Sequence, residues 1–468
     1  MATFSSGYSA ALGDILSQVN DAFSGKSTGI NVSSVVSELM QIQRQPETQM
    51  QAEQTTINSQ ISALTTIGTQ LTALQSSVQA LEDPVSGALA QMTTGSSDSS
   101  VVAASADTTA VAGTHSVTVQ QLATVSSSYS AYIPSGSSLA GATITVKYGP
   151  DPNNPLSTDT INVPSTDTTL QQAADYINQG SYGVTASVVT DSQGSRLELT
   201  SKTSGANGNL TVTSGATTFT DSAGVDAQLT VDGVPIDSAT NNVTGAVTGV
   251  TFSLGATTDT AVQISVEPDT TGAATALSNF VTAYNAVIGS INSQYTLDSN
   301  GKEGVLSGDS MLQSLQSSLL SMISTSVSGV GNYVNLQSMG IEMQNDGTLQ
   351  INSATLSTAL SSDYSDVKAF FQSASPLGWG QMANTEMMHL TDPTLGPVAA
   401  DINGLTQTNN DLSNQISDFE ANMAVVQQQL TTQYGNLDSL LMQYPMQIQA
   451  AQAQLGSLMG SNNSSNNG

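Results

Sequence analysis

Apolar residues recur at helical spacing at both ends of this chain, and they alternate with polar residues in its middle. Near the start they follow one another at steps of three and four, first over residues 31–44 and again over 47–82. That spacing places them on one face of a helix. Proline lacks a backbone N–H and disfavours helical conformation in the residue before it, but it suits the first turn of a helix. Pro46 is therefore predicted to separate two helices.

The C-terminal end carries the strongest periodic signal, because apolar residues recur at steps of seven, four and three between Leu405 and Leu458. This is the spacing of a helix-packing seam. Pro445 is expected to kink or break the helix, since proline removes a backbone hydrogen bond. A region without helical periodicity separates the two helical ends. The chain therefore runs out along the first helix and returns along the second. We therefore expect residues 47–82 to pack antiparallel to residues 405–434.

The middle of the chain, residues 98–270, consists of short alternating runs rich in Thr, Val and Gly, which are typical of antiparallel strands. The fold class predicted by this order is α+β. Long antiparallel terminal helices form a coiled-coil-like stalk or bundle, and antiparallel β-rich domains are inserted between them. Shorter elements are predicted as helices at 169–179, 273–295 and 308–325, a helical pair at 354–371, and a β-hairpin with a tight turn at Asp346-Gly347.

The same pattern predicts how the chain divides into structural units. The terminal leg helices are expected to contact other subunits, and the stalk is expected to carry the β domains at one end. The expected units are a flexible N-terminal arm (1–30), terminal leg helices (31–45 and 436–468), a helical stalk and head-proximal domain (46–97 and 271–435), an inner β domain (98–124 and 222–270) and an outer β domain (125–221).

The charge balance narrows the range of partners. Seven Lys and Arg residues stand against 36 Asp and Glu, which gives a formal net charge of −29. Nucleic-acid binding requires clustered basic side chains, and an anionic membrane repels a chain this acidic. No apolar run reaches the roughly 18 residues that a membrane span needs. We therefore expect no nucleic-acid partner and no membrane insertion.

Cysteine is absent, which excludes disulfides, thiolate catalysis and Cys-based metal sites. The first residues contain neither the basic stretch nor the continuous apolar core of a secretory signal peptide. Low charge and abundant hydroxyl side chains favour an extracellular protein. We expect export by a route that reads no cleavable signal peptide.

Candidate catalytic residues are few. His115 lies in a strand-like run and His389 in a loop-like stretch before Asp392-Pro393, and neither has a catalytic or metal-ligating partner at a readable spacing. No phosphate-binding glycine loop or nucleophile elbow is present. We expect no enzyme activity, no cofactor and no metal site.

The terminal segments of the chain, residues 31–44 and 436–459, are the candidate functional site. A lone helix with one apolar stripe is marginal in water and needs a partner. The partner is either another subunit or the chain itself, as an intramolecular bundle. Likewise, Pro46 is either a hinge between leg and body or a simple corner. The candidate interface residues are Val32, Val35, Val36, Leu39, Ile42, Leu437, Leu441, Ile448, Leu455 and Leu458.

Several segments resemble a known family. "GINVSSVVSELMQIQRQP" (29–46) resembles the opening signature of the flagellar filament cap family, also called hook-associated protein 2, with Asn31 where an aspartate is common. Asparagine caps a helix as well as aspartate does. "TLQQAADYINQGSYGVTASVVTDSQGSRLELTSKTSG" (169–205) is similar to a motif that flagellin and the hook-associated proteins share. "AQLTVDGVPIDSATNNVTGAVTGVTFSL" (227–254) resembles the start of the family's C-terminal region.

This resemblance implies a cap at the distal tip of a growing bacterial flagellar filament. Several subunits would form a homo-oligomeric ring with leg-like helical ends, beneath which exported flagellin is retained, folds and polymerises. Export would use the flagellar type III apparatus. The implied partners are other copies of the chain, flagellin, the hook–filament junction proteins and a flagellar export chaperone.

Two alternatives remain open at the level of sequence. The first is an extracellular adhesin that binds host or surface glycans through its β domains, although aromatic residues make up only 4% of the chain. The second is a hook–filament junction protein, which shares helical ends but should lack the opening signature at 29–46.

Overall fold

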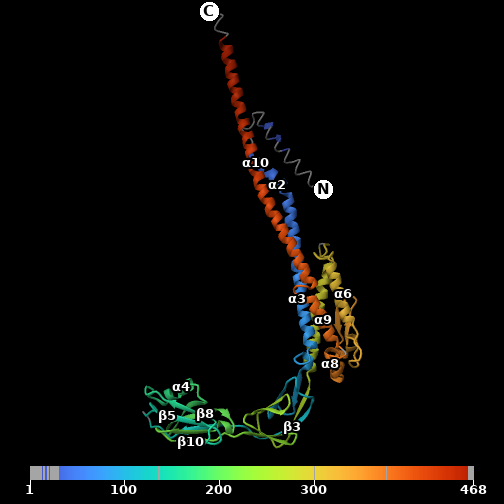
Figure 1. Ribbon diagram of the computed structural model, residues 1–468. Helices are drawn as coiled ribbons and strands as arrows, with labels where there is room; N and C mark the ends of the chain where they lie inside the picture. Colours follow the sequence, from blue (N-terminus) through green and yellow to red (C-terminus); the bar gives the residue numbers. More distant parts are fainter. Residues whose placement is uncertain are drawn as a thin grey trace, which may run out of the picture.

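The computed structural model describes residues 31–134, 137–299, 301–375 and 377–461, together with the single positions 13, 16, 17, 20 and 21. A long helical stalk carries a group of shorter helices on its flank, and two β domains extend sideways from its lower end (Figure 1). The fold predicted from the sequence is confirmed: it is α+β, with antiparallel terminal helices and β domains inserted between them. The predicted N-terminal arm (1–30) lies almost entirely outside the described residues.

The stalk consists of α3 (Gln45–Glu82) and α10 (Pro397–Ser461), with α2 (Val32–Gln43) near its upper end. Gly68 faces Val398, and the amide of Asn409 donates to the side-chain oxygen of Asn58 at 3.1 Å. In these two pairs the residue number falls along α3 as it rises along α10, so the helices are antiparallel. The predicted packing of the two terminal helices is confirmed.

The expected break at Pro445 is wrong, since α10 continues to Ser461. A proline removes only one hydrogen bond from a helix of 65 residues, and the turns on both sides keep theirs.

The group of shorter helices packs on the lower half of α3. One hydrophobic core runs from Leu64 of α3 through these helices to Val398 of α10. The helices and the hairpin predicted for this region are present, but the hairpin turn is wider than predicted, because Gln344 pairs with Thr348 around it. The elements are α5 (Thr270–Tyr295), α6 (Ser310–Ser324), α7 (Ser353–Ser362), α8 (Tyr364–Gln372), α9 (Trp379–Thr391), β16 (Ile341–Met343), β17 (Leu349–Ile351) and the short helices η1 (Ala88–Ala90) and η3 (Gln337–Met339).

The β domain nearer the stalk contains two sheets around one core. The sheets have the strand orders β1-β15-β3-β11-β12 and β13-β14-β2. Because β1 pairs antiparallel with β15, the two chain segments that join this domain to the stalk leave side by side. The strands are β1 (Met92–Ser96), β2 (Val102–Ala106), β3 (Gly113–Gln121), β11 (Ala227–Val231), β12 (Val234–Ser238), β13 (Asn242–Val247), β14 (Val250–Leu254) and β15 (Val262–Pro268).

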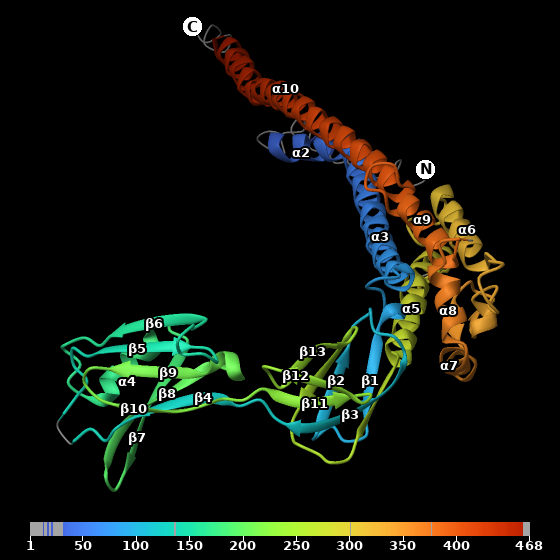
Figure 2. The same ribbon diagram turned by 60° about the horizontal axis from the view of Figure 1, so that its bottom comes forward.

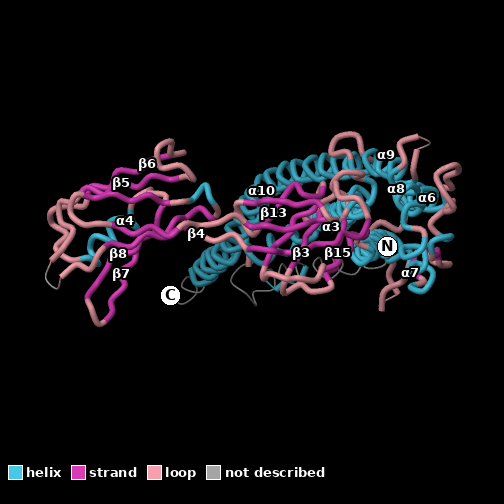
Figure 3. Tube along the Cα trace, turned by 90° about the horizontal axis from the view of Figure 1, so that it is seen from below, coloured by secondary structure: helices cyan, strands magenta, loops and turns pink. Residues whose placement is uncertain are grey.

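The β domain farther from the stalk has a separate core, in which two sheets and the predicted short helix α4 pack together. The strand orders are β10-β4-β8-β7 and β6-β5-β9. Figure 3 shows the two β domains in line, joined by narrow connections. The elements are β4 (Val125–Ser130), β5 (Thr143–Tyr148), β6 (Ser157–Asn162), α4 (Leu170–Gln179), β7 (Val184–Asp191), β8 (Gly194–Ser204), η2 (Ala206–Gly208), β9 (Leu210–Ser214) and β10 (Phe219–Ser222).

Candidate assembly site on the terminal helices

Helix α2 begins where the sequence predicts. The side chain of Asn31 accepts a hydrogen bond from the backbone N–H of Ser34 at 3.2 Å, which satisfies one of the free donors at the helix start. Val35, Val36 and Met40 then recur at helical spacing and are buried. The cap and the apolar face together explain why a helix of only 12 residues forms here.

Part of the apolar face of α2 packs on α10 of the same chain. Val35 is fully buried and Leu441 is 8% exposed, and the two form a small core with Leu39 and Tyr434 around them. The intramolecular bundle that the sequence left open therefore exists at this point. Val32 and Ile42 are half-buried.

The corner between α2 and α3 lies at Arg44. This residue has φ −83° and ψ 3°, and its N–H still bonds the carbonyl of Met40 at 2.9 Å. Helix α3 begins directly after it, with Pro46 in the first turn, where a missing N–H removes no helical hydrogen bond. The predicted separation of two helices at the proline is confirmed, and α2 leaves the line of α3 at this corner (Figure 2).

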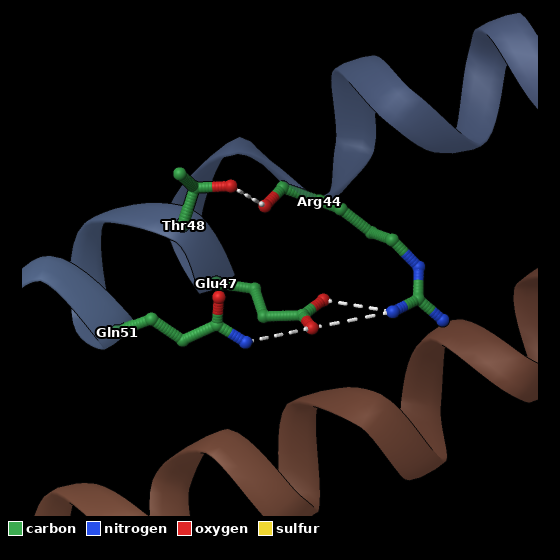
Figure 4. Close-up of polar contacts among 4 residues, drawn as sticks. All are labelled: Arg44, Glu47, Thr48 and Gln51. Carbon is green, nitrogen blue, oxygen red and sulfur yellow. Dashed lines mark hydrogen bonds and ion pairs between the residues drawn. The ribbon is translucent and has the colours of Figure 1, made fainter.

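An ion pair spans the corner (Figure 4). Nη1 of Arg44 lies 3.0 Å from Oε2 and 3.3 Å from Oε1 of Glu47, and the amide of Gln51 donates to Oε1 at 3.3 Å. The Glu47 side chain is only 10% exposed. Because a buried carboxylate is costly without partners, these contacts hold α2 and α3 in one mutual orientation. Glu47 also lies at the positive end of α3.

The other side of α2 borders an open groove against α10, which we call the α2–α10 groove. Its volume is about 670 Å³. Apolar side chains of α2 form its floor, and polar side chains of both helices form its rim. The lining residues are Val32, Ser33, Val36, Ser37, Met40, Gln41 and Arg44 of α2 and Gln427 and Thr431 of α10.

Beyond α2, the end of α10 extends past every other described element (Figures 1 and 2). Leu437 is 37% exposed, Ile448 is 50% exposed and Leu455 is 57% exposed. Leu458 lies in α10, but its side chain is outside the described residues. No Lys, Arg, Asp or Glu follows Asp438, so this end is apolar and amide-rich without charge. We call residues 445–461 of α10 the free end of α10.

The structure thus divides the candidate interface residues into two groups. Val35, Val36 and Leu441 are used mainly within the chain, whereas Leu437, Ile448 and Leu455 expose apolar surface. Sequence reasoning missed Met40 as a core residue, although it lies four positions after Val36 and its spacing could have indicated this. It also missed the Arg44–Glu47 ion pair.

The two histidines lie outside this site. Nδ1 of His115 lies 2.7 Å from Oδ2 of Asp232, a partner 117 residues away that no sequence spacing could indicate. This contact lowers the pKa of the Asp232 carboxyl, and Oδ1 of the same carboxylate accepts the backbone N–H of Ser116. Asp232 has φ 53° in the turn between β11 and β12, so His115 holds a strained turn in place.

The predicted loop at His389 is wrong, because this residue lies in the last turn of α9. Ala383, Met387 and Leu390 are buried at steps of four and three, and this apolar face extends the helix to Thr391.

Within the described residues, no cluster of three metal-ligating side chains occurs. The described helices also include none that is long and apolar enough to cross a membrane.

Family models match most of the chain. The model of the flagellar hook-associated protein 2 N-terminus matches residues 28–126, and that of its C-terminus matches residues 224–445. The flagellin hook IN motif matches residues 143–203, within the outer β domain. These models describe a structural component of the bacterial flagellum. The chain belongs to the flagellar hook-associated protein 2 family.

Individual relatives agree with this assignment. The chain is 29% identical to the B-type flagellar hook-associated protein 2 of Pseudomonas aeruginosa, over 82% of this chain and 87% of that protein. It is 28% identical to the flagellar hook-associated protein 2 of Escherichia coli K12, over 87% of this chain and 93% of that protein. The crystal structure of the D1-D2-D3 domains of the flagellar cap protein FliD from Escherichia coli superimposes with a TM-score of 0.60 at 27% identity, covering 74% of this chain and 99% of that one.

Proposed function

We propose that this protein caps the distal end of the bacterial flagellar filament as a homo-oligomeric ring, where it retains exported flagellin and promotes its folding and polymerisation. Membership of the flagellar hook-associated protein 2 family carries this proposal. The cap is a structural assembly, and its subunits act by position rather than by covalent chemistry.

The geometry supports different roles for the terminal helices, the helical body and the β domains of the subunit. Residues 31–45 and 436–468 act as legs that contact other subunits or the filament, and the exposed apolar side chains on the free end of α10 supply the surface for this contact. The helical body (46–97 and 271–435) carries an inner β domain (98–124 and 222–270) and an outer β domain (125–221). No specific observation favours glycan adhesion by these β domains over the cap function.

The proposed setting is extracellular, at the filament tip, after export without a cleavable signal peptide. The proposed partners are further copies of the chain, flagellin, the hook–filament junction proteins and a flagellar export chaperone. Apolar helical ends support this set, because a chain with only 9% charged residues recognises partners by shape and apolar contact rather than by ionic pairing.

The test is deletion of the gene, followed by electron microscopy of the cells and a flagellin blot of the medium. A cap protein predicts hooks without filaments and flagellin lost to the medium as monomer, with both defects reversed by the intact gene. Filaments of normal length and number on the deletion strain contradict the proposal.

We further propose that Pro46 acts as a hinge that lets the leg α2 change its angle to α3 during assembly. The Arg44–Glu47 ion pair fixes one position of this hinge, and Gln51 still donates to the buried Glu47 carboxylate when the pair opens. Arg44 is 39% exposed at its side chain, so water can solvate its guanidinium when the pair opens.

Pro46→Ala is expected to restore helical preference across the corner and to reduce swarming by at least half. The free energy of unfolding of the subunit should change by less than about 1 kcal/mol, because Pro46 is exposed and removes no core contact. Gln45→Ala, at the exposed neighbouring position, is the matched control and should leave swarming unchanged. Wild-type swarming by Pro46→Ala would mean that the proline only marks a corner.

A further inference from the structure

Two short connections join the inner and the outer β domain (Figure 3). Residues 122–124 lead from β3 to β4, and residues 223–226 lead from β10 to β11. The backbone N–H of Thr124 donates to the carbonyl of Val225 at 2.9 Å, and the N–H of Val225 donates to Oγ1 of Thr124 at 3.2 Å. The two connections are therefore hydrogen-bonded to each other and are not independent linkers.

The connections also keep the antiparallel register of the strands on both sides. One pair belongs to β4 and β10 of the outer domain, and another belongs to β3 and β11 of the inner domain. The pair in the connections lies three residues from each of them on both strands. A single two-stranded ribbon therefore runs from one domain into the other, and we call it the ribbon. Its successive pairs are Ser127–Ser222, Thr124–Val225 and Gln121–Gln228.

A second set of contacts between the domains lies at the end of β8. The hydroxyl of Ser204 donates to the carbonyl of Ala239 at 2.7 Å, and the N–H of Ala206 donates to Oδ1 of Asp226 at 2.7 Å. Ala239 follows β12 and lies outside the ribbon. An isolated two-stranded ribbon is only marginally stable, so contacts outside it are needed to fix an angle. We call Ser204, Gly205 and Ala206, together with Asp226 and Ala239, the latch.

Gly205 allows the close approach of the two domains in the latch. Its φ is 76°, a conformation that glycine adopts without a steric penalty. Its N–H donates to the carbonyl of Thr124 at 3.0 Å, which ties the latch to the ribbon. A Cβ at this position would lie 2.7 Å from the carbonyl oxygen of Ala239 and closer still to the Asp226 carboxylate. The latch therefore has no room for a side chain here.

We propose that the ribbon and the latch lock the two β domains into one rigid arm, so that a displacement of the outer domain moves the inner domain with it. Domains joined by a small interface move relative to each other by default. Here the ribbon holds the domains along one line, and the latch adds a contact away from that line. Reorientation of the arm then occurs at its base, where β1 and β15 join the stalk. This inference concerns the isolated subunit and does not depend on the cap function.

The absence of cysteine allows the joint to be measured with spin labels in the full chain. Val234→Cys on the inner domain and Leu156→Cys on the outer domain form the cross-domain pair, at side chains that are 58% and 66% exposed. Leu156→Cys with Val189→Cys is the reference pair within the outer domain. Double electron–electron resonance should give distance distributions of equal width for the two pairs. A cross-domain distribution about twofold broader than the reference would overturn the proposal.

Gly205→Ala should unlock the joint, and Gly141→Ala is the matched control. Gly141 also lies in the outer domain and has φ 74°, but a Cβ there meets nothing within 4 Å. Both variants therefore carry the same backbone strain, and only Gly205→Ala also pushes against the inner domain. The cross-domain distribution should become about twofold broader in Gly205→Ala and keep its width in Gly141→Ala. Equal widths in the two variants would contradict the lock.

Two substitutions of Asp226 test the latch without adding an atom to it, and they decide the matter if Gly205→Ala fails to fold. Asp226→Ala removes the acceptor of the Ala206 N–H, whereas Asp226→Asn keeps an oxygen that can accept it. The cross-domain distribution should broaden in the alanine variant and stay narrow in the asparagine variant, with far-ultraviolet circular dichroism unchanged in both. An unchanged width in Asp226→Ala would show that the latch does not hold the arm.

Discussion

Removal of residues 445–468 is expected to abolish filament capping while the subunit remains folded. The segment lies beyond the reach of α2, and its apolar side chains Ile448 and Leu455 are half exposed or more. Because it contributes nothing to the three large cores, the free energy of unfolding should change by less than about 0.5 kcal/mol. The proposed subunit contacts, in contrast, lose most of their apolar surface.

The effect on assembly should be large because the lost contacts repeat around a ring. Every subunit of a closed ring uses the same surface, so one truncation removes each copy of the interface. In the deletion strain, the truncated protein should restore fewer than about one tenth of the filaments that the intact protein restores, if each lost interface costs at least 1.4 kcal/mol. Filament counts by electron microscopy and flagellin in the medium measure this, and urea unfolding followed by circular dichroism measures stability.

A shorter truncation provides the control. Removal of residues 462–468 leaves α10 complete to Ser461 and should preserve capping. If the longer truncation also restores filaments in normal number, the free end of α10 is not an assembly surface. If the longer truncation unfolds the subunit, the segment has a role within the chain that its exposure does not indicate.

The sequence predicted the stalk because the physical signal was local and repeated. Steps of three and four mark the apolar faces of α3 and α10, and the β-rich insertion between them requires an antiparallel return. The helix boundary at Pro46 was predicted correctly because a proline in a first turn removes no hydrogen bond. The break expected at Pro445 does not occur, since the cost of a proline inside a helix depends on how much helix surrounds it, and α10 extends on both sides of Pro445.

Contacts between residues far apart in the chain could not be predicted from the sequence. The pairing of Val35 with Leu441 depends on the register of two helices whose relative shift no spacing reveals. His115 and Asp232 meet only because β3 and β11 are neighbours in one sheet. The Arg44–Glu47 pair is close in sequence, but its significance depends on the burial of Glu47 by the corner. Periodicity identifies the face of a helix, whereas tertiary packing decides what that face meets.

Trp379→Ala is expected to cost about 3–5 kcal/mol of stability in the helical body, the range for removal of a fully buried aromatic side chain. Trp379 is 1% exposed. Its ring centroid lies 5.4 Å from that of Phe280, 6.2 Å from that of Phe370 and 5.6 Å from that of Phe371. Its indole N–H also donates to the carbonyl of Met322 at 3.0 Å. One side chain thus joins α5, α6, α8 and α9.

Two further variants separate the contributions of this residue. Trp379→Phe keeps an aromatic ring but removes the indole N–H, so the Met322 carbonyl keeps only the longer hydrogen bond from the backbone N–H of Thr325 at 3.4 Å. The loss of stability should be about 2 kcal/mol smaller than in the alanine variant. Leu395→Ala, at a position that is 83% exposed, should change stability by less than about 0.5 kcal/mol. Urea unfolding at 222 nm reports the helical transition. A cost below 1 kcal/mol for Trp379→Ala would show that the shorter helices do not depend on this contact.

The part of the protein that loses stability in Trp379→Ala is as informative as the size of the loss. The two β domains have cores of their own, and Trp379 belongs to neither. Trp379→Ala should therefore lower the helical transition while the unfolding of the outer β domain keeps its midpoint, which near-ultraviolet signals can report because this domain holds five of the 12 tyrosines of the chain. A shared shift of all transitions would mean that the stalk and the β domains unfold as one unit. Separate transitions would mean that the β domains stay folded in the Trp379→Ala variant when its helical body is destabilised. Any loss of cap assembly by this variant could then be assigned to the helices.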